Sequence, residues 1–334
     1  MNENKGIPLE GKDTSNDPAM KKVIDVQARI KELKRENRQL LKDREQLLEE
    51  YLDKVNSRPL PPAPTKRKVA RAERIRIMMG DLHGMYMDRA CAEAVLADVE
   101  ELDPDEIVLG GDMAEVGGWL AKHQPIGFVA LSDYTYQEDI SATTWFLDKL
   151  QMAAPHATIH YLEGNHEQRV ERWVMDQTQA HKRDGEFLLQ AFGPQALLRL
   201  EDRKIQYYKQ DGIHGKGLPR GWIKLGKMFF VHELKTSKNA AMDGLASTAD
   251  HVTYFHSHRS DAATMVYPSV GMVKAFCPGC LCKTQPIWRH SKPNSWSQGY
   301  DVDFITKDGV FQRIQAPIWR GKSIIHAVID RFKK

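Results

Sequence analysis

The pattern of hydrophobic and polar positions divides the chain into four segments. Residues 1–18 are polar, with Gly, Pro, Asn and Asp and no periodicity, which predicts a disordered tail. Residues 19–56 contain no Gly or Pro and repeat their apolar positions at helical spacing, which predicts one long helix. Prolines recur through residues 57–73 and predict a semi-rigid, basic linker. Residues 74–334 alternate short apolar runs with amphipathic windows and predict the globular domain.

The predicted helix carries a heptad repeat. Its two seam positions hold Val23, Ile30, Asn37, Arg44 and Tyr51 on one side, and Val26, Leu33, Leu40 and Leu47 on the other. Asn37 favours a parallel pair, because two Asn side chains can hydrogen-bond across a two-stranded seam. The pattern predicts a coiled coil and a homodimer formed through residues 20–54. Leu41 and Leu48 widen the stripe, so a larger bundle, or a helix packed on its own globular domain, stays open.

Short strands and helices alternate in the first half of the globular segment. The runs "RIRIMM", "DEIVLGG" and "ATIHYLEG" predict strands, and helices are predicted at about residues 87–101 and over "SATTWFLDKLQMA", opened by Ser141. Strand, helix, strand in this order predicts parallel pairing and an α/β domain. In the last third, the runs "GKMFFVHE", "DHVTYFHSH", "VGMVKAF", "YDVDFIT" and "GVFQRIQAP" predict a second, more antiparallel sheet.

Composition bears on the cellular location of the protein and on its binding partners. The chain of 334 residues is 41% hydrophobic, and it contains no run of the roughly 18 to 20 apolar residues that a membrane-spanning helix needs. Its first residues lack the apolar core of a secretion signal, so we expect a cytoplasmic protein without membrane association. The net charge of +3 is too small to indicate nucleic-acid binding by itself. Cations form a basic cluster at the end of the linker and the start of the globular segment, where they would either contact phosphates or stay solvated: Lys66, Arg67, Lys68, Arg71, Arg74 and Arg76.

Three of the four cysteines lie in the run "CPGCLC". Cys277 and Cys280 have the spacing of a zinc knuckle, but no second pair completes a site. The run therefore predicts a turn with buried thiols, and metal binding by Cys277, Cys280 or Cys282 stays open. Trp296, in the following "SWSQGY", is predicted to be a strand or turn residue of the second sheet.

Five loops carry residues that bind divalent metal ions in proteins. Each loop directly follows an apolar strand, and the candidates are Asp81 and His83 in "GDLHG", Asp112 in "GGDMAE", Asn165 and His166 in "GNHE", His232 in "FFVHE", and His256 and His258 in "FHSHR". Ligand sites in α/β sheets lie at the carboxyl ends of strands, where all five loops fall. Carboxylate, amide and imidazole donors suit borderline divalent ions, and their number exceeds what one ion needs. The set predicts two metal ions, an arrangement suited to phosphoester hydrolysis.

These loops resemble those of the calcineurin-like metallophosphoesterases, which run Asp-x-His, Gly-Asp, Gly-Asn-His-Asp/Glu, a lone His and His-x-His. The resemblance implies an α/β fold, a two-sheet β-sandwich flanked by helices. It implies ligand sets for two metal ions, Asp81, His83 and His258 for one, and Asn165, His232 and His256 for the other. Asp112 would bridge the ions in catalysis, and His166 would be a catalytic residue that stabilises the phosphoryl group or protonates the leaving oxygen. Mn²⁺ is the first expectation for both ions, with Fe, Zn, Ni or Co as alternatives.

Three positions depart from the usual pattern of that family. Glu115 stands where Asp or Asn is usual, Glu233 follows His232 where Gly is common, and Phe255 replaces the usual Gly before His256. None of these changes removes a ligand, but Glu115 and Glu233 fall near the substrate mouth and leave the substrate open. The runs "GNHEQRVERW", "GCLC" and "SWSQGY" also resemble metallophosphoesterases encoded by bacteriophages, which would place the protein in the host cytoplasm.

Cations beside the loops bear on the substrate. Arg169 and Arg172 follow "GNHE" at helical spacing, and Arg259 follows the last candidate ligand. We expect Arg169 and Arg259 to bind substrate, and the function to be nuclease-like hydrolysis of phosphodiesters in DNA or RNA. The alternative is that Arg169 and Arg172 pair with nearby glutamates, in a phosphomonoesterase, a protein phosphatase or a small-nucleotide phosphodiesterase. A coiled-coil assembly protein with a metal-binding but non-catalytic domain is the alternative from another class.

Overall fold

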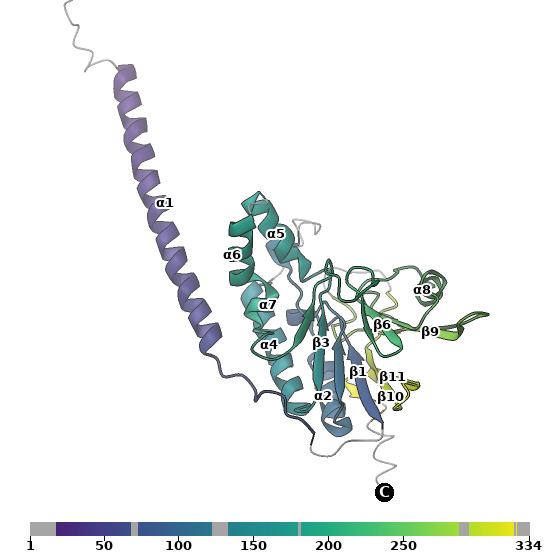
Figure 1. Cartoon of the computed structure of the whole chain (residues 1–334). Helices are drawn as coiled ribbons and strands as arrows, with labels where there is room; N and C mark the ends of the chain where they lie inside the picture. Colours follow the sequence, from purple (N-terminus) through teal and green to yellow (C-terminus); the bar gives the residue numbers. More distant parts are fainter. Residues whose placement is uncertain are drawn as a thin grey trace, which may run out of the picture. The chain divides into compact units, whose positions relative to one another are not determined.

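The computed structural model describes residues 18–67, 73–121, 133–179, 182–286, 294–323 and 325 (Figure 1). Residues 1–17 of the predicted tail lie outside this range. The chain divides into two compact units, one ending at Arg58 and the other beginning at Pro59.

Helix α1 (Pro18–Ser57) runs unbroken over 40 residues. Residues 19–56 contain no Gly or Pro to interrupt it, and side-chain pairs one turn apart, such as Arg29 with Glu32, stabilise its surface. Four apolar residues of the predicted seam are exposed, namely Val26, Ile30, Leu33 and Leu40. An exposed apolar seam is what a coiled-coil partner would cover, and the dimer stays a prediction.

The first sheet of the second unit has seven strands in the order β12-β11-β10-β1-β2-β3-β4. Their bounds are β1 Arg74–Met79, β2 Glu106–Leu109, β3 Thr158–Leu162, β4 Gln206–Tyr208, β10 Gly299–Ile305, β11 Phe311–Trp319 and β12 Lys322–Ser323. Strands β1 to β4 are parallel, as the strand-helix-strand order predicts. Two crossovers contain α2 (Arg89–Leu102) and α4 (Tyr136–Ala153). Helix α4 begins before the predicted Ser141, because Thr135 caps it by accepting a hydrogen bond from the amide of Glu138.

Two strands predicted for the second sheet belong to the first. β10 pairs antiparallel with β1, where Ile77 lies opposite Val302, and β11 pairs antiparallel with β10. Nearly every residue of β10 is buried, which requires cover on both faces of the strand. The prediction was wrong because the order of strands along the chain does not reveal that the last hairpin returns to cover the open edge of β1.

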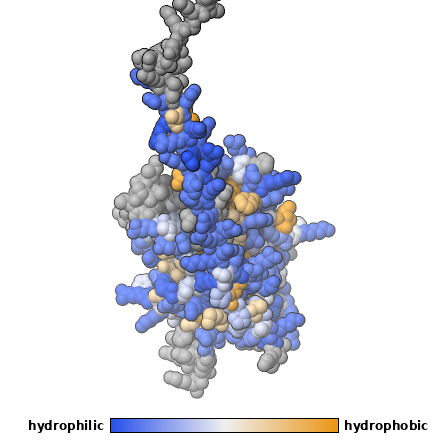
Figure 2. Space-filling view, turned by 90° about the vertical axis from the view of Figure 1, so that its left-hand side faces the viewer, coloured by the Kyte–Doolittle hydropathy of each residue, from blue (hydrophilic) through white to orange (hydrophobic). Residues whose placement is uncertain are grey.

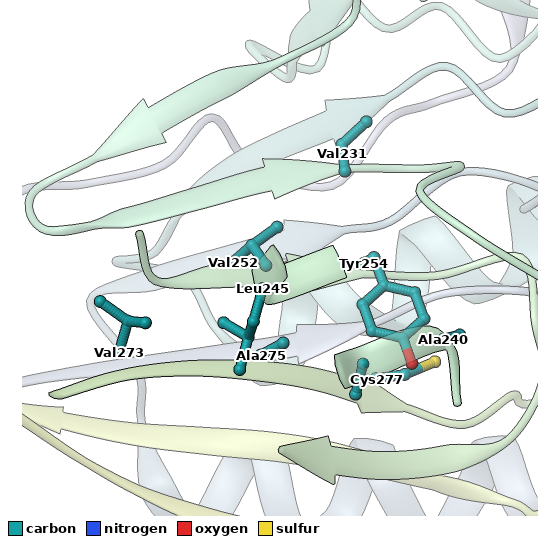
Figure 3. Close-up of a cluster of buried hydrophobic side chains, with 9 residues drawn as sticks. Val231, Ala240, Leu245, Val252, Tyr254, Val273, Ala275 and Cys277 are labelled. Atoms are coloured by element: carbon teal, nitrogen blue, oxygen red, sulfur yellow. The ribbon is translucent and has the colours of Figure 1, made fainter. Parts of the chain in front are cut away.

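The second sheet has five strands in the order β5-β6-β7-β9-β8. Their bounds are β5 Ile223–Leu225, β6 Met228–Val231, β7 Val252–Tyr254, β8 Ser260–Tyr267 and β9 Gly271–Pro278. The predicted antiparallel character holds for the outer pairs, but β6, β7 and β9 are parallel. The cause is helix α8 (Ala240–Thr248), which crosses from β6 to β7 and packs Leu245 into a buried cluster with Val252 and Tyr254 (Figure 3).

The two sheets enclose a shared apolar core. Met78, Val108 and Leu162 of the first sheet pack in one cluster with Phe230 and Phe276 of the second. Helix α2 covers the first sheet on its other face, where the hydroxyl of Tyr300 donates to Asp98 at 2.6 Å. The architecture is the predicted two-sheet sandwich flanked by helices. The remaining elements are η2 Gly84–Tyr86, η3 Gly118–Leu120, α5 Gln168–Thr178, α6 Lys182–Phe192 and α7 Pro194–Leu197.

The arginines of the basic cluster are neutralised far from the predicted ligands. Arg67 forms ion pairs with Asp103 and Asp105, and Arg74 and Arg76 both pair with Glu106. Glu106 is the first residue of β2, so these pairs lie at the amino ends of the parallel strands, opposite the carboxyl ends that carry the loops. These three arginines therefore pair with carboxylates, and not with phosphates as one prediction had it. Lys68 and Arg71 lie outside the described residues.

Among the helices described, none is both long and apolar enough to cross a bilayer. Figure 2 shows one face of the molecule, where hydrophilic residues predominate and hydrophobic residues are scattered.

Candidate metal centre

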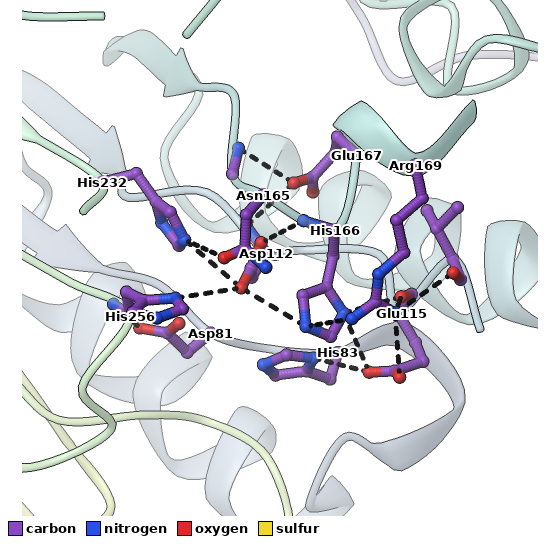
Figure 4. A network of polar contacts seen from close by, with 12 residues as sticks. Asp81, His83, Asp112, Glu115, Asn165, His166, Glu167, Arg169, His232 and His256 are labelled. Atoms are coloured by element: carbon purple, nitrogen blue, oxygen red, sulfur yellow. Dashed lines mark hydrogen bonds and ion pairs between the residues drawn. The ribbon is translucent and has the colours of Figure 1, made fainter. Parts of the chain in front are cut away.

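The five predicted loops meet at one edge of the sandwich (Figure 4). They follow β1, β2, β3, β6 and β7, and backbone hydrogen bonds tie them to one another. The amide of Asp81 donates to the carbonyl of Gly111 at 3.0 Å, and the amide of His83 donates to the backbone carbonyl of Asp112 at 2.9 Å. The amide of Phe255 donates to the carbonyl of His232 at 2.9 Å. All seven predicted metal ligands therefore lie in one cluster.

One group of donors surrounds His258. Its Nε2 lies 3.1 Å from Nε2 of His83 and 3.2 Å from Oδ1 of Asp81. All three residues are buried. Donor atoms about 3 Å apart can share one ion with bonds of about 2.1 Å. The structure thus brings together the three residues of the first predicted ligand set.

A second group lies on the other side of Asp112. Nε2 of His232 is 3.3 Å from Oδ2 of Asp112 and 3.0 Å from Oδ1 of Asn165. Nδ1 of His256 is 4.0 Å from the same Asp112 oxygen. Asp112 also lies within metal-sharing distance of His83 and thus stands between the two groups.

Two carboxylate oxygens indicate that the cluster is built for cations. Oδ1 of Asp81 and Oδ2 of Asp112 are buried and accept no hydrogen bond from any described residue. A buried carboxylate oxygen without a donor is costly unless a cation compensates it. Both oxygens face the imidazoles described above, so the residues present fit divalent cations.

Hydrogen bonds on the side of each ring that faces away from the cluster determine which ring nitrogen of His83 and His232 faces the other donors. Nδ1 of His83 donates to Oε2 of Glu115 at 2.7 Å, and Nδ1 of His232 donates to the carbonyl of Gly110 at 2.7 Å. In the neutral ring, these contacts leave Nε2 without a proton, and in both residues Nε2 is directed at the cluster. Glu115 departs from the pattern of the resembled family, and its role as a partner of His83 was not predicted.

Charge within the cluster shifts several pKa values. Burial raises the pKa of Asp112, but His166 and His232 outweigh it and hold that pKa well below its usual value. Burial lowers the pKa of His232, but the attraction of Asp112 prevails and raises it to about 10. Without cations, a proton on His232 therefore compensates the Asp112 charge, and metal binding must displace that proton.

His166 lies beside the candidate ligands, with a donor atom within 4.8 Å of those of His83 and Asp112, and Glu115 and Arg169 contact its ring. Nδ1 of His166 donates to the carbonyl of Glu115 at 2.7 Å, while Nε2 lies 3.7 Å from Oδ2 of Asp112. Burial lowers the pKa of His166, yet Asp112 and Glu115 together raise it to about 9. Nη2 of Arg169 approaches Nε2 at 2.8 Å, a contact that opposes this protonation. Without cations, the two carboxylates are the stronger influence and favour a proton on His166 at neutral pH.

The two arginines predicted to bind substrate differ in placement. Arg169 is buried at the centre, where its guanidinium donates to the carbonyls of Glu115 and Val116. Arg259 instead donates to the carbonyl of Ser237, on the loop after β6. Arg169 is therefore brought together with His166, whereas no contact of the described residues joins Arg259 to the candidate ligands.

Glu167 is a structural member of the centre that sequence reasoning missed. Its carboxylate accepts hydrogen bonds from the amides of Asp112, Met113, Ala114 and Gly164 and from the hydroxyl of Tyr161. Next to it, a Cβ on Gly164 would collide with Asp112. The signal was present in "GNHE", but only the fold shows that the Glu binds the loop after β2.

Most candidate ligands have unusual backbone geometry. Asp81, His83, Asp112, His256 and His258 all have left-handed backbone, with φ between 50° and 68°. Side chains other than Gly adopt this region at a cost, and such residues concentrate at functional sites. The backbone hydrogen bonds between the loops hold these residues in that conformation.

No protein-family model and no curated protein matches this sequence. Among solved structures, the chain is similar to YfcE, a phosphoesterase from E. coli, at 15% identity and a TM-score of 0.31, over 72% of this chain and 98% of that one. It is also similar to vacuolar protein sorting 29 from Cryptosporidium parvum, at 7% identity and a TM-score of 0.35, over 76% and 95% of the two chains. Vps29 from Entamoeba histolytica complexed with Zn²⁺ gives 10% identity, a TM-score of 0.33 and coverage of 75% and 95%. At these values the similarities assign no role to any residue of this chain.

Proposed function

We propose that the protein is a divalent-metal-dependent phosphoester hydrolase that cleaves phosphodiester bonds in nucleic acid. The observation that supports this most is the position of Asp112, which lies between two groups of buried donors and directs an oxygen without a hydrogen-bond donor at them. Asp81, His83 and His258 would hold one ion, Asn165, His232 and His256 the other, and Asp112 both. Mn²⁺ is the first choice, with Fe, Zn, Ni or Co as alternatives.

Two bound ions would lower the pKa of a water between them and neutralise phosphoryl oxygens. The chain's own groups then supply the proton and the orientation. Glu115 anchors Nδ1 of His166, so Nε2 is the atom that donates a proton to the leaving oxygen. Arg169 is fixed by two backbone carbonyls beside Nε2 and adds a cation next to the phosphoryl group.

Exposed cations on the same edge of the sandwich support a polymeric substrate. Lys235 and Lys238 lie on the loop that follows His232, and Lys216 and Arg220 lie on the loop that follows β4. A nucleic-acid backbone extends beyond the phosphate being cleaved, so cations on the surrounding loops would bind its neighbouring phosphates. The basic cluster adds no support, because Arg67, Arg74 and Arg76 pair with carboxylates at the opposite edge.

Mn²⁺-dependent cleavage of end-labelled single- and double-stranded DNA and RNA tests the proposal, with p-nitrophenyl phosphate and its bis-ester in parallel. We expect cleavage of a polymer and of the bis-ester, lost in Asp112→Asn and unchanged in Glu201→Gln, which alters an exposed carboxylate. Turnover of small esters alone would replace the nuclease by a phosphatase or a small-nucleotide phosphodiesterase. No turnover of any ester would leave the coiled-coil assembly protein as the better reading.

A further inference from the structure

Three histidines of the centre, His83, His232 and His258, share a pattern in the contacts of their outer ring nitrogen. In His83 and His232, Nδ1 donates to an oxygen, and Nε2 is thereby directed at the other donors. His258 has the same arrangement, but its Nδ1 contacts Sγ of Cys282 at 3.7 Å. The partner of this third histidine is a sulfur atom, in a position where metal-binding histidines usually have a carboxylate, a carbonyl or water.

Cys282 is fixed in place by hydrogen bonds to the centre itself. Its carbonyl accepts a hydrogen bond from Nε2 of Gln298 at 2.9 Å, and its neighbour Leu281 donates to the carbonyl of Asp81 at 3.2 Å. Cys282 also forms an isolated bridge with Met87, and its side chain is buried. The sulfur is therefore held against His258 by the same loop that positions Asp81.

We propose that Cys282 is a positioning residue for His258. Its sulfur accepts a hydrogen bond from Nδ1–H, so His258 presents an unprotonated Nε2 to the ion shared with Asp81 and His83. The inference rests on the proposed metal-dependent function. Donor atoms of His83, His258 and Cys282 lie within 4.8 Å of one another, which also raises direct ligation by the thiolate. The geometry favours the outer role, because the sulfur faces Nδ1 whereas Asp81 and His83 face Nε2.

Titration of the full chain with Mn²⁺, followed by the electron paramagnetic resonance signal of the free ion, tests this role without relying on turnover. Removing an outer partner of a metal-binding histidine weakens affinity by about 10- to 100-fold. We expect Cys282→Ala to weaken one of two binding steps by about 10-fold and to leave the other unchanged. Cys282→Ser, which keeps an acceptor, should recover most of the loss. Cys91→Ala, which removes another buried thiol, should leave both steps at the wild-type level.

Three results would overturn the inference. Equal affinities in all four proteins would show that the sulfur does not position His258. Weakening of both steps to the same extent in Cys282→Ala and Cys91→Ala would indicate loose packing instead. With Co²⁺ in place of Mn²⁺, an intense near-ultraviolet sulfur-to-cobalt band that disappears in Cys282→Ser would make Cys282 a ligand itself.

The same titration separates this inference from the function on which it rests. A wild-type protein that binds no divalent ion would refute the proposed function. A wild-type protein that binds two ions and hydrolyses esters, with variants of equal affinity, would refute the role of Cys282 alone. Thermal unfolding of each variant with a chelator present would show that the proteins compared are folded.

Discussion

Glu167 illustrates how a residue that faces no substrate can determine the geometry of the centre. Its two oxygens accept four backbone N–H groups, and three of those belong to the loop that carries Asp112. A carboxylate can accept at both oxygens, whereas an amide of the same shape directs an NH₂ group at some of these donors. This position therefore requires the carboxylate of Glu, and a side chain of the same size that lacks it does not suffice.

Replacing this carboxylate should disturb the Asp112 loop. We expect Glu167→Gln to destabilise the protein by about 2 kcal/mol, because at least one buried amide loses its acceptor. The same variant should bind Mn²⁺ less tightly, since Asp112 moves with its loop. Urea unfolding and a Mn²⁺ titration measure the two effects. An unchanged unfolding midpoint together with unchanged affinity would contradict this role of Glu167.

His166 should separate catalysis from metal binding. In His166→Gln we expect kcat to fall by about 100- to 10,000-fold, the usual contribution of a positioned general acid, while two ions still bind. Steady-state kinetics on the bis-ester and the metal content of the purified protein provide the comparison. If the variant loses an ion along with its activity, His166 is a ligand rather than a proton donor.

At the scale of residues, the sequence predicted those members of the centre that can be recognised from their own place in the chain. Asp81, His83 and Asp112 could be named because each directly follows an apolar strand, and the structure brings them together with the other candidate ligands. The partners behind them could not be named. Glu115 contacts His83, and Cys282 contacts His258, in each case from another loop. Nothing in the sequence around Glu115 or Cys282 indicates these contacts.

At the scale of elements, an ion cluster lies within the first sheet. Arg313 on β11 forms two hydrogen bonds with Asp303 and one with Asp301, both on β10. Burial raises the pKa of Asp301 to about 7, although Arg313 opposes the shift. The folded protein therefore binds this proton more tightly than the unfolded chain, whose pKa is about 3.9.

This shift makes stability depend on pH. As pH rises from about 4 to about 7, the unfolded chain releases the proton first, and the folded state loses stability relative to it. We expect the free energy of unfolding of the wild type to decrease by about 2 kcal/mol between pH 5 and pH 7.5 through this group, and Asp301→Asn to remove that part of the decrease. Urea unfolding at both pH values, with a chelator present, measures it. Equal pH slopes in the two proteins would exclude Asp301 as the cause.

The elements that the sequence predicted well are those with local signals. The three strands before the first loops, the helix over residues 89–102 and the long α1 follow from apolar periodicity and the absence of Gly and Pro. Assignment of strands to sheets failed for β10 and β11, because pairing with β1 joins segments more than 200 residues apart. Periodicity indicates that a strand exists but does not identify its neighbour.

At the scale of the whole molecule, we expect α1 to join two copies of the chain. Ile30 and Leu33 are about half exposed, at 46% and 48%, which favours a partner that covers them. The double variant Ile30→Glu and Leu33→Glu should convert a dimer into a monomer, as measured by light scattering of the full chain. Ala28→Glu and Arg35→Glu adds the same side chains away from the seam and should leave the dimer intact. A monomeric wild type, or a dimer in both variants, would contradict the coiled coil.

The left-handed backbone of the candidate ligands lowers the stability of the loops that carry the proposed function. Each such residue costs about 1 kcal/mol or more that glycine would not, so the loops are less stable than they would be without their ligands. Selection for heat resistance alone, in the absence of ions, should therefore recover glycine at positions such as Asp81 or His258 and lose the proposed hydrolysis as a result. Engineering of this protein for durability would best begin away from the centre, because at these positions the same substitution would raise thermal tolerance and remove the proposed activity.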